Sequence, residues 1–588
     1  MKREYLLTIL FILFSASLLA LGLRGLPGNP TSIELSSPKW KENGPFELSP
    51  ERGRFVLLYS VAEDKSLQFS KPLADFAMPD LALSEDGKYV SMFTPGVSFL
   101  ALPGYYLGKY YQVSQAGAFA VIALFTLFNI ILIRAISVRL GAHPMAANLG
   151  AMTFAFATPA FAYAVTFYQH QISTFTILAC VYLLLRHKGL KSLVLIWFLA
   201  AFSIVVDNPN FFLMIPIALY ALGRIILPEK SGEGLQINIK LMGFLTLIFA
   251  LIPLGLLLWF NQASHGNPFE LPGTLRNARI QNEPSADMPV AQKSDSAQTL
   301  ENTPNGKSAL GFFQTRNLSN GFYTHFASPD RGIFWFAPVI ILGILGLYFV
   351  YQRSILAGNL VLAIAGINVL IYSMWGDPYG GWAFGSRYLI PMYALLGIGL
   401  AMALSEWRKK IIFLAIFYLF FGYSAWINTL GALTSDSNPP KIEIQALEKI
   451  TGKEEKYTYE RNWQYLQNKG TNSFVYQSAL KDKMTPMTYF ETTAGIVIAG
   501  AFVMLVALFL FGAVRQEGKL GHKNKNSGNR GMILKKMIKL IEGKSLRAGR
   551  KVMCEIGRLC LLGNRAKKNI LEIYSAFIAA ILSKVFKK

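Results

Sequence analysis

Long apolar runs separated by short polar connections make up most of the first 515 residues. Crossing a bilayer takes roughly 20 apolar residues in a helix. We interpret the first run as a retained signal-anchor helix, since no small-residue cleavage site clearly follows it. The pattern predicts an all-α polytopic membrane protein with about 12 transmembrane helices, near residues 5–23, 115–135, 145–165, 171–186, 192–206, 210–227, 241–261, 333–352, 354–374, 388–406, 411–430 and 493–514.

Basic residues in the short connections predict one orientation for these helices. Cytoplasmic connections of membrane proteins are enriched in Lys and Arg. If the N-terminus is cytoplasmic, every short basic connection falls on the cytoplasmic side, and so does the basic C-terminus. We therefore expect a multi-pass protein of the cytoplasmic membrane with both termini in the cytoplasm. The residues that support this orientation are Arg134, Arg139, Arg186, Lys188, Lys191, Arg224, Lys230, Arg353, Arg408, Lys409 and Lys410.

This orientation places four polar connections on the extracytoplasmic side. The first follows the first helix directly, and we expect it to be a loop of mixed secondary structure. Long loops cross the membrane whatever their charge, so the lysines within them do not contradict the orientation. The second connection is rich in Asn, Ser and Pro over residues 281–308. The four connections span residues 24–112, 262–332, 376–387 and 431–491.

The C-terminal segment, residues 516–588, differs in composition from the membrane domain of residues 1–515. Apolar residues recur there at helical spacing with lysines between them, which predicts interfacial helices on the anionic inner leaflet. A small helical hairpin that packs on itself or on a partner is the alternative. The net charge of +23 follows from this tail and the cytoplasmic connections. We therefore expect membrane lipids as partners and expect no binding to nucleic acid.

The first outer loop contains an acid and two arginines in the stretch SPERGRFVLLY. Glu51 lies at the start of a predicted amphipathic helix, where its carboxylate could accept a proton from an incoming hydroxyl. Arg52 and Arg54 follow, and their fork-shaped donors could bind a phosphate. An acid at a helix start is also stabilised by the helix dipole. Taken alone, these three residues fit that second explanation better.

A second polar group follows in PDLALSEDGKYVS, before the chain returns to apolar sequence. Asp80 has no evident role in a turn, so a site acid and a solvated loop acid are both open. Asp86 belongs to an Asp-Gly turn signature, which explains it without any ligand. Lys88 and Tyr89 stand beside this turn as candidate substrate-binding residues.

Four further polar residues lie at the predicted outer ends of apolar runs. Asp207 interrupts SIVVDNPNFFLM, and an acid in a membrane recess is a functional candidate by default, although Asp also caps turns. His170 in FYQHQ has no second histidine at metal-ligand spacing, which argues against a zinc site. Arg331 and Arg387 each begin an inward-running span, where they could bind a lipid phosphate or anchor the helix end.

Seven segments follow one another across roughly residues 1–410: PERGRFVLLYSVAED, PDLALSEDGKYVSMFTPGVSFLALPGYYLG, FYQHQIS, VDNPN, NQASHGNPFE, SPDRGIFWFAPVIILGILGL and WGDPYGGWAFGSRYLIP. Together they resemble one family, the multi-spanning C-type glycosyltransferases, in the branch of protein mannosyltransferases and aminoarabinose transferases. Glu51 is followed by Arg52 where that family often has an Asp-Glu or Asp-Asp pair, and Phe93-Thr94 stands where some relatives have an acid-Lys pair. Lys88 is then the candidate replacement for the lysine that binds the donor phosphate.

The resemblance implies a reaction and its substrates. It implies a sugar donor carried on polyprenyl phosphate, a lipid, glycan or protein acceptor, and a site on the extracytoplasmic face. We expect one of Glu51 and Asp80 to take the acceptor proton, and the other to orient the sugar or bind a divalent metal ion. A transporter or flippase, and a polymerase or ligase of lipid-linked saccharides, are the alternative classes. The expected substrate-binding residues are Arg52, Arg54, Asp86, Lys88, Tyr89, His170, Asp207, Arg331 and Arg387.

Overall fold

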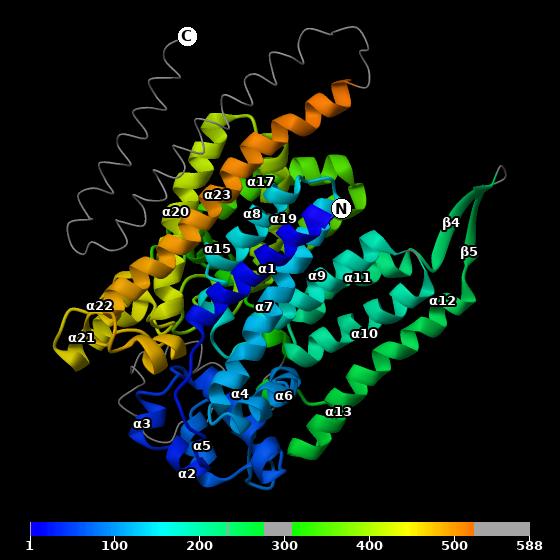
Figure 1. Ribbon diagram of the computed structural model, residues 1–588. Helices are drawn as coiled ribbons and strands as arrows, with labels where there is room; N and C mark the ends of the chain where they lie inside the picture. The colour runs from blue at the N-terminus through cyan, green and yellow to red at the C-terminus, as the bar shows by residue number, and fades with distance from the viewer. Residues whose placement is uncertain (1, 188, 232–233, 276–308, 522–588) are drawn as a thin grey trace. The chain divides into compact units, whose positions relative to one another are not determined.

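The chain is mostly helical in the computed structural model (Figure 1). The structure describes residues 2–187, 189–231, 234–275 and 309–521. The chain divides into two compact units, Met1–Gly512 and Ala513–Lys588, and the apolar segments that could cross a membrane belong to the first. The interfacial helices predicted in the tail beyond residue 521, and the polar stretch 281–308, lie outside the described residues.

Six segments of the described chain are helical, long and apolar enough to cross a membrane. Shorter apolar helices accompany them, and each predicted apolar run contains a helix, although the helix in the run 210–227 ends at Leu222. The protein is therefore a multi-pass membrane protein. The long segments are α7 (Ser114–Arg139), α12 and α13 together (Leu241–His265), α18 (Ile355–Ser373), η8 with α19 (Arg387–Glu406), α20 (Ile411–Leu433) and the part Pro486–Leu510 of α23 (Pro486–Gly521). The shorter ones are α1 (Lys2–Gly22), α9 (His170–Arg186), α10 (Leu190–Val206), α11 (Asn210–Leu222) and α17 (Pro338–Arg353).

The helix in the apolar run 145–165 also ends early. α8 spans Pro144–Phe156, so the predicted helix over 145–165 is wrong beyond Phe156. Pro159 explains the break, because proline has no N–H to donate and disfavours helical backbone in the residue before it. Residues 157–169 continue as a buried, largely irregular segment with one short 3-10 turn, Ala162–Ala164. Irregular backbone at membrane depth is tolerated where protein surrounds it.

The first outer loop folds as a small layer of helices and strands at one end of the helices (Figure 1). Its strands form an antiparallel sheet in the order β1-β3-β2, which agrees with the expected mixed structure. A second antiparallel pair, β4 with β5, follows α11, so the prediction of an all-α fold outside the first loop is wrong there. The elements of the first outer loop are α2 (Ser32–Leu35), α3 (Pro38–Lys41), α4 (Ser49–Tyr59), β1 (Gln68–Phe69), α5 (Lys71–Ala77), β2 (Leu81–Leu83), β3 (Tyr89–Ser91) and α6 (Gly96–Tyr110). The separate pair consists of β4 (Ile226–Ser231) and β5 (Gly234–Ile239).

The remaining short helices lie in the connections that follow. α15 and α16 precede α17, and α21 and α22 follow α20 on the way to α23. Their bounds are α15 (Leu318–Phe326), α16 (Ile333–Phe336), α21 (Ile444–Thr451) and α22 (Glu460–Asn468).

The connections between the long helices gather at two ends of the membrane domain. At one end, hydrogen bonds join the predicted outer connections to one another: Glu51 to Phe167, Asp207 to Gln169, Arg24 to Asp436 and Arg331 to Tyr379. At the other end, they join the predicted cytoplasmic connections: Arg139 to Leu185, Arg224 to His187, His143 to Ser405 and Arg353 to Glu406. Successive connections therefore alternate between the two ends of the membrane domain, as the sequence predicts.

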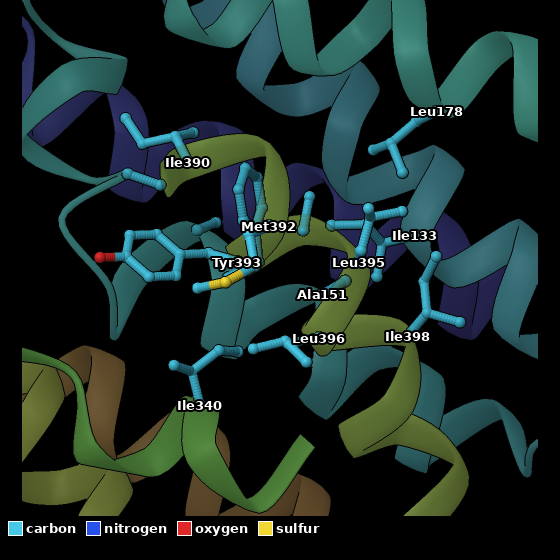
Figure 2. Packing of buried hydrophobic residues seen from close by; sticks show 14 of the residues in the cluster. Ile133, Ala151, Leu178, Ile340, Ile390, Met392, Tyr393, Leu395, Leu396 and Ile398 are labelled. Carbon is cyan, nitrogen blue, oxygen red and sulfur yellow. The ribbon is translucent and has the colours of Figure 1, made fainter. Parts of the chain in front are cut away.

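The core is built around α19. Almost every residue of this helix is buried, and it packs against α7, α8, α9 and α17. Figure 2 shows Leu395 and Ile398 of α19 on the side of Ile133 of α7, and Tyr393 of the same helix pointing to the opposite side. Because α19 is enclosed by other helices, the residues at its outer end are held rigidly and away from lipid. Arg387 stands one turn before that end.

Candidate functional site

Glu51 joins α4 to the irregular segment 157–169. Its carboxylate is fully buried. One oxygen accepts the backbone N–H of Glu47 at 3.2 Å, as acids at helix starts commonly do, and the other accepts the N–H of Phe167 at 2.9 Å. Burial and the nearby carboxylate of Asp436 raise the pKa of Glu51 to about 8. A carboxylate with a raised pKa is a stronger base than an exposed one, which suits proton abstraction near neutral pH.

The next residue of the irregular segment, Tyr168, lies close to two arginines. The guanidinium carbon of Arg387 lies 4.8 Å from the centre of the Tyr168 ring, and that of Arg54 lies 5.6 Å from it. His170 stacks on the same ring, with 5.7 Å between ring centres. Arg54 is one helical turn after Glu51 on α4, so the acid and both cations border one region.

Asp207 closes this region from the end of α10. Its carboxylate accepts a hydrogen bond of 3.2 Å from the side chain of Gln169. Burial raises the pKa of Asp207 to about 6, although the charge of Arg54 opposes that rise. Burial lowers the pKa of Arg54, and Asp207 opposes that shift in turn. The two groups therefore form an electrostatic pair.

Several buried polar atoms in this region have no hydrogen-bond partner among the described residues. Buried polar atoms of folded proteins are nearly always paired, and each unpaired one costs stability. A set of them in one place is typical of a site that a polar ligand fills. They are the hydroxyls of Thr166 and Tyr168, Oε1 of Gln169, Nε2 of His170, Oδ1 of Asn208, and Nε and Nη1 of Arg387.

A cluster of three charged residues, Arg24, Glu47 and Asp436, lies near Glu51 and acts on its carboxylate electrostatically. Arg24 follows the first apolar helix and donates to Asp436 at 2.9 Å and to Glu47 at 3.4 Å. The carboxylate of Glu47 also accepts from Asn472 at 2.8 Å. Burial lowers the pKa of Arg24, but Glu47 and Asp436 together raise it above its usual range. Burial raises the pKa of Glu47 to about 7, with Arg24 opposing.

The structure brings together five of the residues that the sequence marks as candidates, and it adds several that the sequence did not mark. The five are Glu51, Arg54, His170, Asp207 and Arg387. Tyr168 was missed, although it stands two residues before His170 in the FYQHQ motif. Arg24, Glu47 and Asp436 were missed because nothing local marks them. Their importance comes from contacts between distant parts of the chain.

Other predicted residues lie away from this region. Arg52 donates to the carbonyl of Lys41 at 3.2 Å and lies over the Phe76 ring, on the opposite side of α4 from the Tyr168 contact. Asp86 and Lys88 are exposed at the turn between β2 and β3, where Gly87 has a φ of 72°. Tyr89 is half-buried in β3, paired with Leu83. The turn alone accounts for these last three residues.

Asp80 and Arg331 are buried, and both are engaged by protein groups. Asp80 accepts a hydrogen bond of 2.6 Å from the hydroxyl of Ser49, the first residue of α4. Arg331 donates to the carbonyls of Tyr379, Asp330, Gly381 and Asn438 at 2.8–3.1 Å. Every guanidinium nitrogen of Arg331 is thus used to hold loops together. This geometry favours a structural role for Arg331 over the predicted contact with a lipid phosphate.

The sequence leaves open a divalent metal ion bound by Glu51 or Asp80, and the described part of the chain has no ligand cluster for one. No group of three or more His, Cys, Asp or Glu side chains there is arranged to hold a metal ion. Within the described residues, the carboxylates of Glu47, Glu51 and Asp436 are instead held by N–H groups, a hydroxyl and one guanidinium.

Comparison with known proteins gives a distant likeness to solved structures. No protein-family model and no curated protein matches this chain. Two solved structures of ArnT from Cupriavidus metallidurans resemble it, one in the apo state (TM-score 0.39, 13% identity) and one bound to undecaprenyl phosphate (TM-score 0.40, 14% identity). Each alignment covers 86% of this chain and 76% of the other. A likeness this distant carries no argument about activity.

Proposed function

We propose that this protein is a membrane glycosyltransferase that moves a sugar from a polyprenyl-phosphate donor to a lipid, glycan or protein acceptor. One observation carries the proposal. A buried carboxylate, Glu51, and two buried arginines, Arg54 and Arg387, meet around unpartnered polar atoms at one end of a multi-pass membrane protein. An anionic phosphate is the ligand that two such arginines bind best.

The chemistry assigns a role to each charge. The acceptor hydroxyl attacks the anomeric carbon of the sugar and loses its proton, for which Glu51 is the base. The leaving phosphate gains negative charge, which fixed cationic donors stabilise most when they need not reorganise. Arg387 has two nitrogens available for that contact among the described residues, and Arg54 supplies a second positive charge. Asp207 balances Arg54 when the site is empty.

The membrane arrangement follows from the same proposal. We infer about 12 crossings, with α8 and the irregular segment after it counted as one. The end that holds Glu51 and Arg387 faces the extracytoplasmic side, since the basic connections lie at the opposite end and such connections are cytoplasmic in membrane proteins. The basic tail then lies against the anionic inner leaflet.

The test is cleavage of the donor by purified protein in detergent, without a membrane gradient. A panel of sugars on polyprenyl phosphate is offered, and the released polyprenyl phosphate is measured. We expect release from at least one donor, and we expect Arg387→Ala to raise the donor KM or reduce turnover. Lys88→Ala changes an exposed turn residue and should leave the rate unchanged. Transport of intact donor without cleavage would favour a flippase and contradict the proposal.

A further inference from the structure

The ring of Tyr168 is fixed on several sides at once. Arg387 and Arg54 lie over it, His170 stacks on it, and Tyr163 meets it edge-on with 5.4 Å between ring centres. Only 1% of the Tyr168 side chain is exposed. The direction of its hydroxyl is therefore set by the fold before any ligand binds, which is the condition for preorganised catalysis.

That hydroxyl is unused within the protein. It has no hydrogen-bond partner among the described residues, and neither do Nε and Nη1 of the neighbouring Arg387. The ordinary pKa of a tyrosine hydroxyl is about 10. The hydroxyl is therefore a neutral O–H donor at physiological pH. A buried donor without an acceptor costs stability, so its presence beside two cations points to an anionic acceptor.

We propose that Tyr168 is a catalytic residue that donates a hydrogen bond to the departing phosphate of the donor lipid. This inference rests on the proposed function. The acceptor oxygen bonds to the anomeric carbon as the bond from that carbon to the phosphate oxygen breaks, and the electron pair leaves with the phosphate. The phosphodiester monoanion becomes a phosphomonoester dianion. Tyr168 keeps its proton, and the acceptor proton goes to Glu51.

The negative charge on the phosphate increases between the bound donor and the transition state, and this determines which kinetic constant Tyr168 affects. The phosphate carries one negative charge in the bound donor and approaches two in the transition state. A hydrogen bond to that oxygen therefore strengthens as the reaction proceeds and lowers the barrier more than it tightens donor binding. Removing it should reduce kcat and leave the donor KM nearly unchanged.

The test is Tyr168→Phe, which removes one oxygen and keeps the ring beside the arginines. We expect kcat to fall by about 10²–10³-fold, the usual effect of losing one preorganised donor to a developing oxyanion. Because the missing hydroxyl had no protein partner, the variant should fold with a Tm equal to or above that of the wild type. The matched control is Tyr105→Phe. Tyr105, on α6, is also buried, and its hydroxyl donates to Glu63 at 2.9 Å.

The outcomes separate this inference from the proposed function. If the wild type releases polyprenyl phosphate and Tyr168→Phe keeps its kcat, the role of Tyr168 is wrong and the glycosyltransferase assignment stands. If the wild type cleaves no donor, the assignment fails before any variant is compared, and the inference fails with it. If Tyr168→Phe does not fold while Tyr105→Phe does, the hydroxyl has a structural partner and the inference is overturned.

Discussion

At the scale of single residues, Glu51 shows how burial can turn an ordinary helix-start acid into a base. The same residue would stabilise α4 by the helix dipole in any exposed loop. Here its second oxygen accepts the N–H of Phe167, and Asp436 stands behind it. Because charge is costly in this surrounding, the pKa of Glu51 rises to about 8. This raised pKa would suit the base role that we propose for Glu51 near neutral pH.

Glu51→Gln should lower turnover by about 10²–10⁴-fold, the usual contribution of a general base. In the wild type, turnover should increase with pH up to about 8, where Glu51 becomes the carboxylate. The test measures kcat from pH 5 to pH 9 for both proteins. A variant that keeps the wild-type rate and pH profile would exclude Glu51 as the base.

The same pKa has a consequence for folding. An exposed Glu in the unfolded chain titrates near its ordinary pKa of about 4.3, so the folded state binds more protons between that pH and about 8. The stability due to Glu51 is therefore complete below about pH 4.3 and is lost as pH rises through 8. Glu51→Gln should show a smaller fall in Tm from pH 5 to pH 8 than the wild type. Glu47 adds its own fall, since its pKa is about 7.

Arg331 and Arg387 each begin a predicted inward-running span, but their contacts differ. We expect Arg331→Ala to destabilise the fold by about 3 kcal/mol or more, because it leaves buried carbonyls without donors. Arg387→Ala frees a single backbone carbonyl, that of Gly380, and should change Tm much less. Thermal denaturation of both variants in detergent checks this. An Arg331→Ala protein with wild-type Tm and an altered donor KM would restore the predicted phosphate contact.

Sequence reasoning reached some of these residues and could not reach others. Glu51, Asp207 and Arg387 attract notice because charged residues are rare beside apolar runs. Asp436 lies in an unremarkable loop, and its partner Arg24 is 412 positions away in the chain. No local pattern encodes such a contact. The engagement of Arg331 by four carbonyls is likewise invisible until its neighbours are placed.

At the scale of elements, the break after α8 matters more to the site than any complete helix. Hydropathy predicted a helix over 145–165, because residues 157–165 are apolar enough to continue one. The proline at position 159 ends it, and the irregular segment then turns Phe167, Tyr168 and Gln169 toward the site. The length of the apolar run therefore predicted where a helix lies, but Pro159 determined where that helix ends.

The contact between α17 and α19 depends on glycine. A Cβ on Gly346 would lie 1.7 Å from the carbonyl oxygen of Gly399, so Gly346→Ala must push these helices apart. We expect a loss of about 3 kcal/mol or more, at the upper end of overpacking effects. Gly366→Ala on α18 is the matched control, since a Cβ there meets no atom within 4 Å. Equal Tm values for the two variants would contradict the close packing of α17 on α19.

At the scale of the whole molecule, the loops divide between two ends. Arg24 and Glu47 of the first outer loop contact Asp436 and Asn472 of the last outer loop, residues 431–491. These loops must therefore lie on the same side of the membrane, whichever side that is. The positive-inside rule selects the extracytoplasmic side, because the short basic connections occupy the opposite end.

Cysteine labelling of intact cells tests both the shared side of these loops and its identity. Asn43→Cys and Glu454→Cys place thiols at exposed positions of the first and last outer loops, and Lys409→Cys places one at an exposed position of a basic connection. The background has Cys554 and Cys560 replaced by Ser, while Cys180 is buried in α9. We expect an impermeant thiol reagent to label Asn43→Cys and Glu454→Cys in intact cells, and Lys409→Cys only after permeabilisation.

The possible failures of this experiment have different meanings. If Lys409→Cys alone is labelled in intact cells, the fold stands but the orientation is inverted, and the site would face the cytoplasm. If Asn43→Cys and Glu454→Cys fall on opposite sides, the buried contact between Arg24 and Asp436 cannot exist. The support for Glu51 would then be lost, because Asp436 and Arg24 are the charges that act on its carboxylate from behind. The labelling pattern thus tests the site as well as the topology.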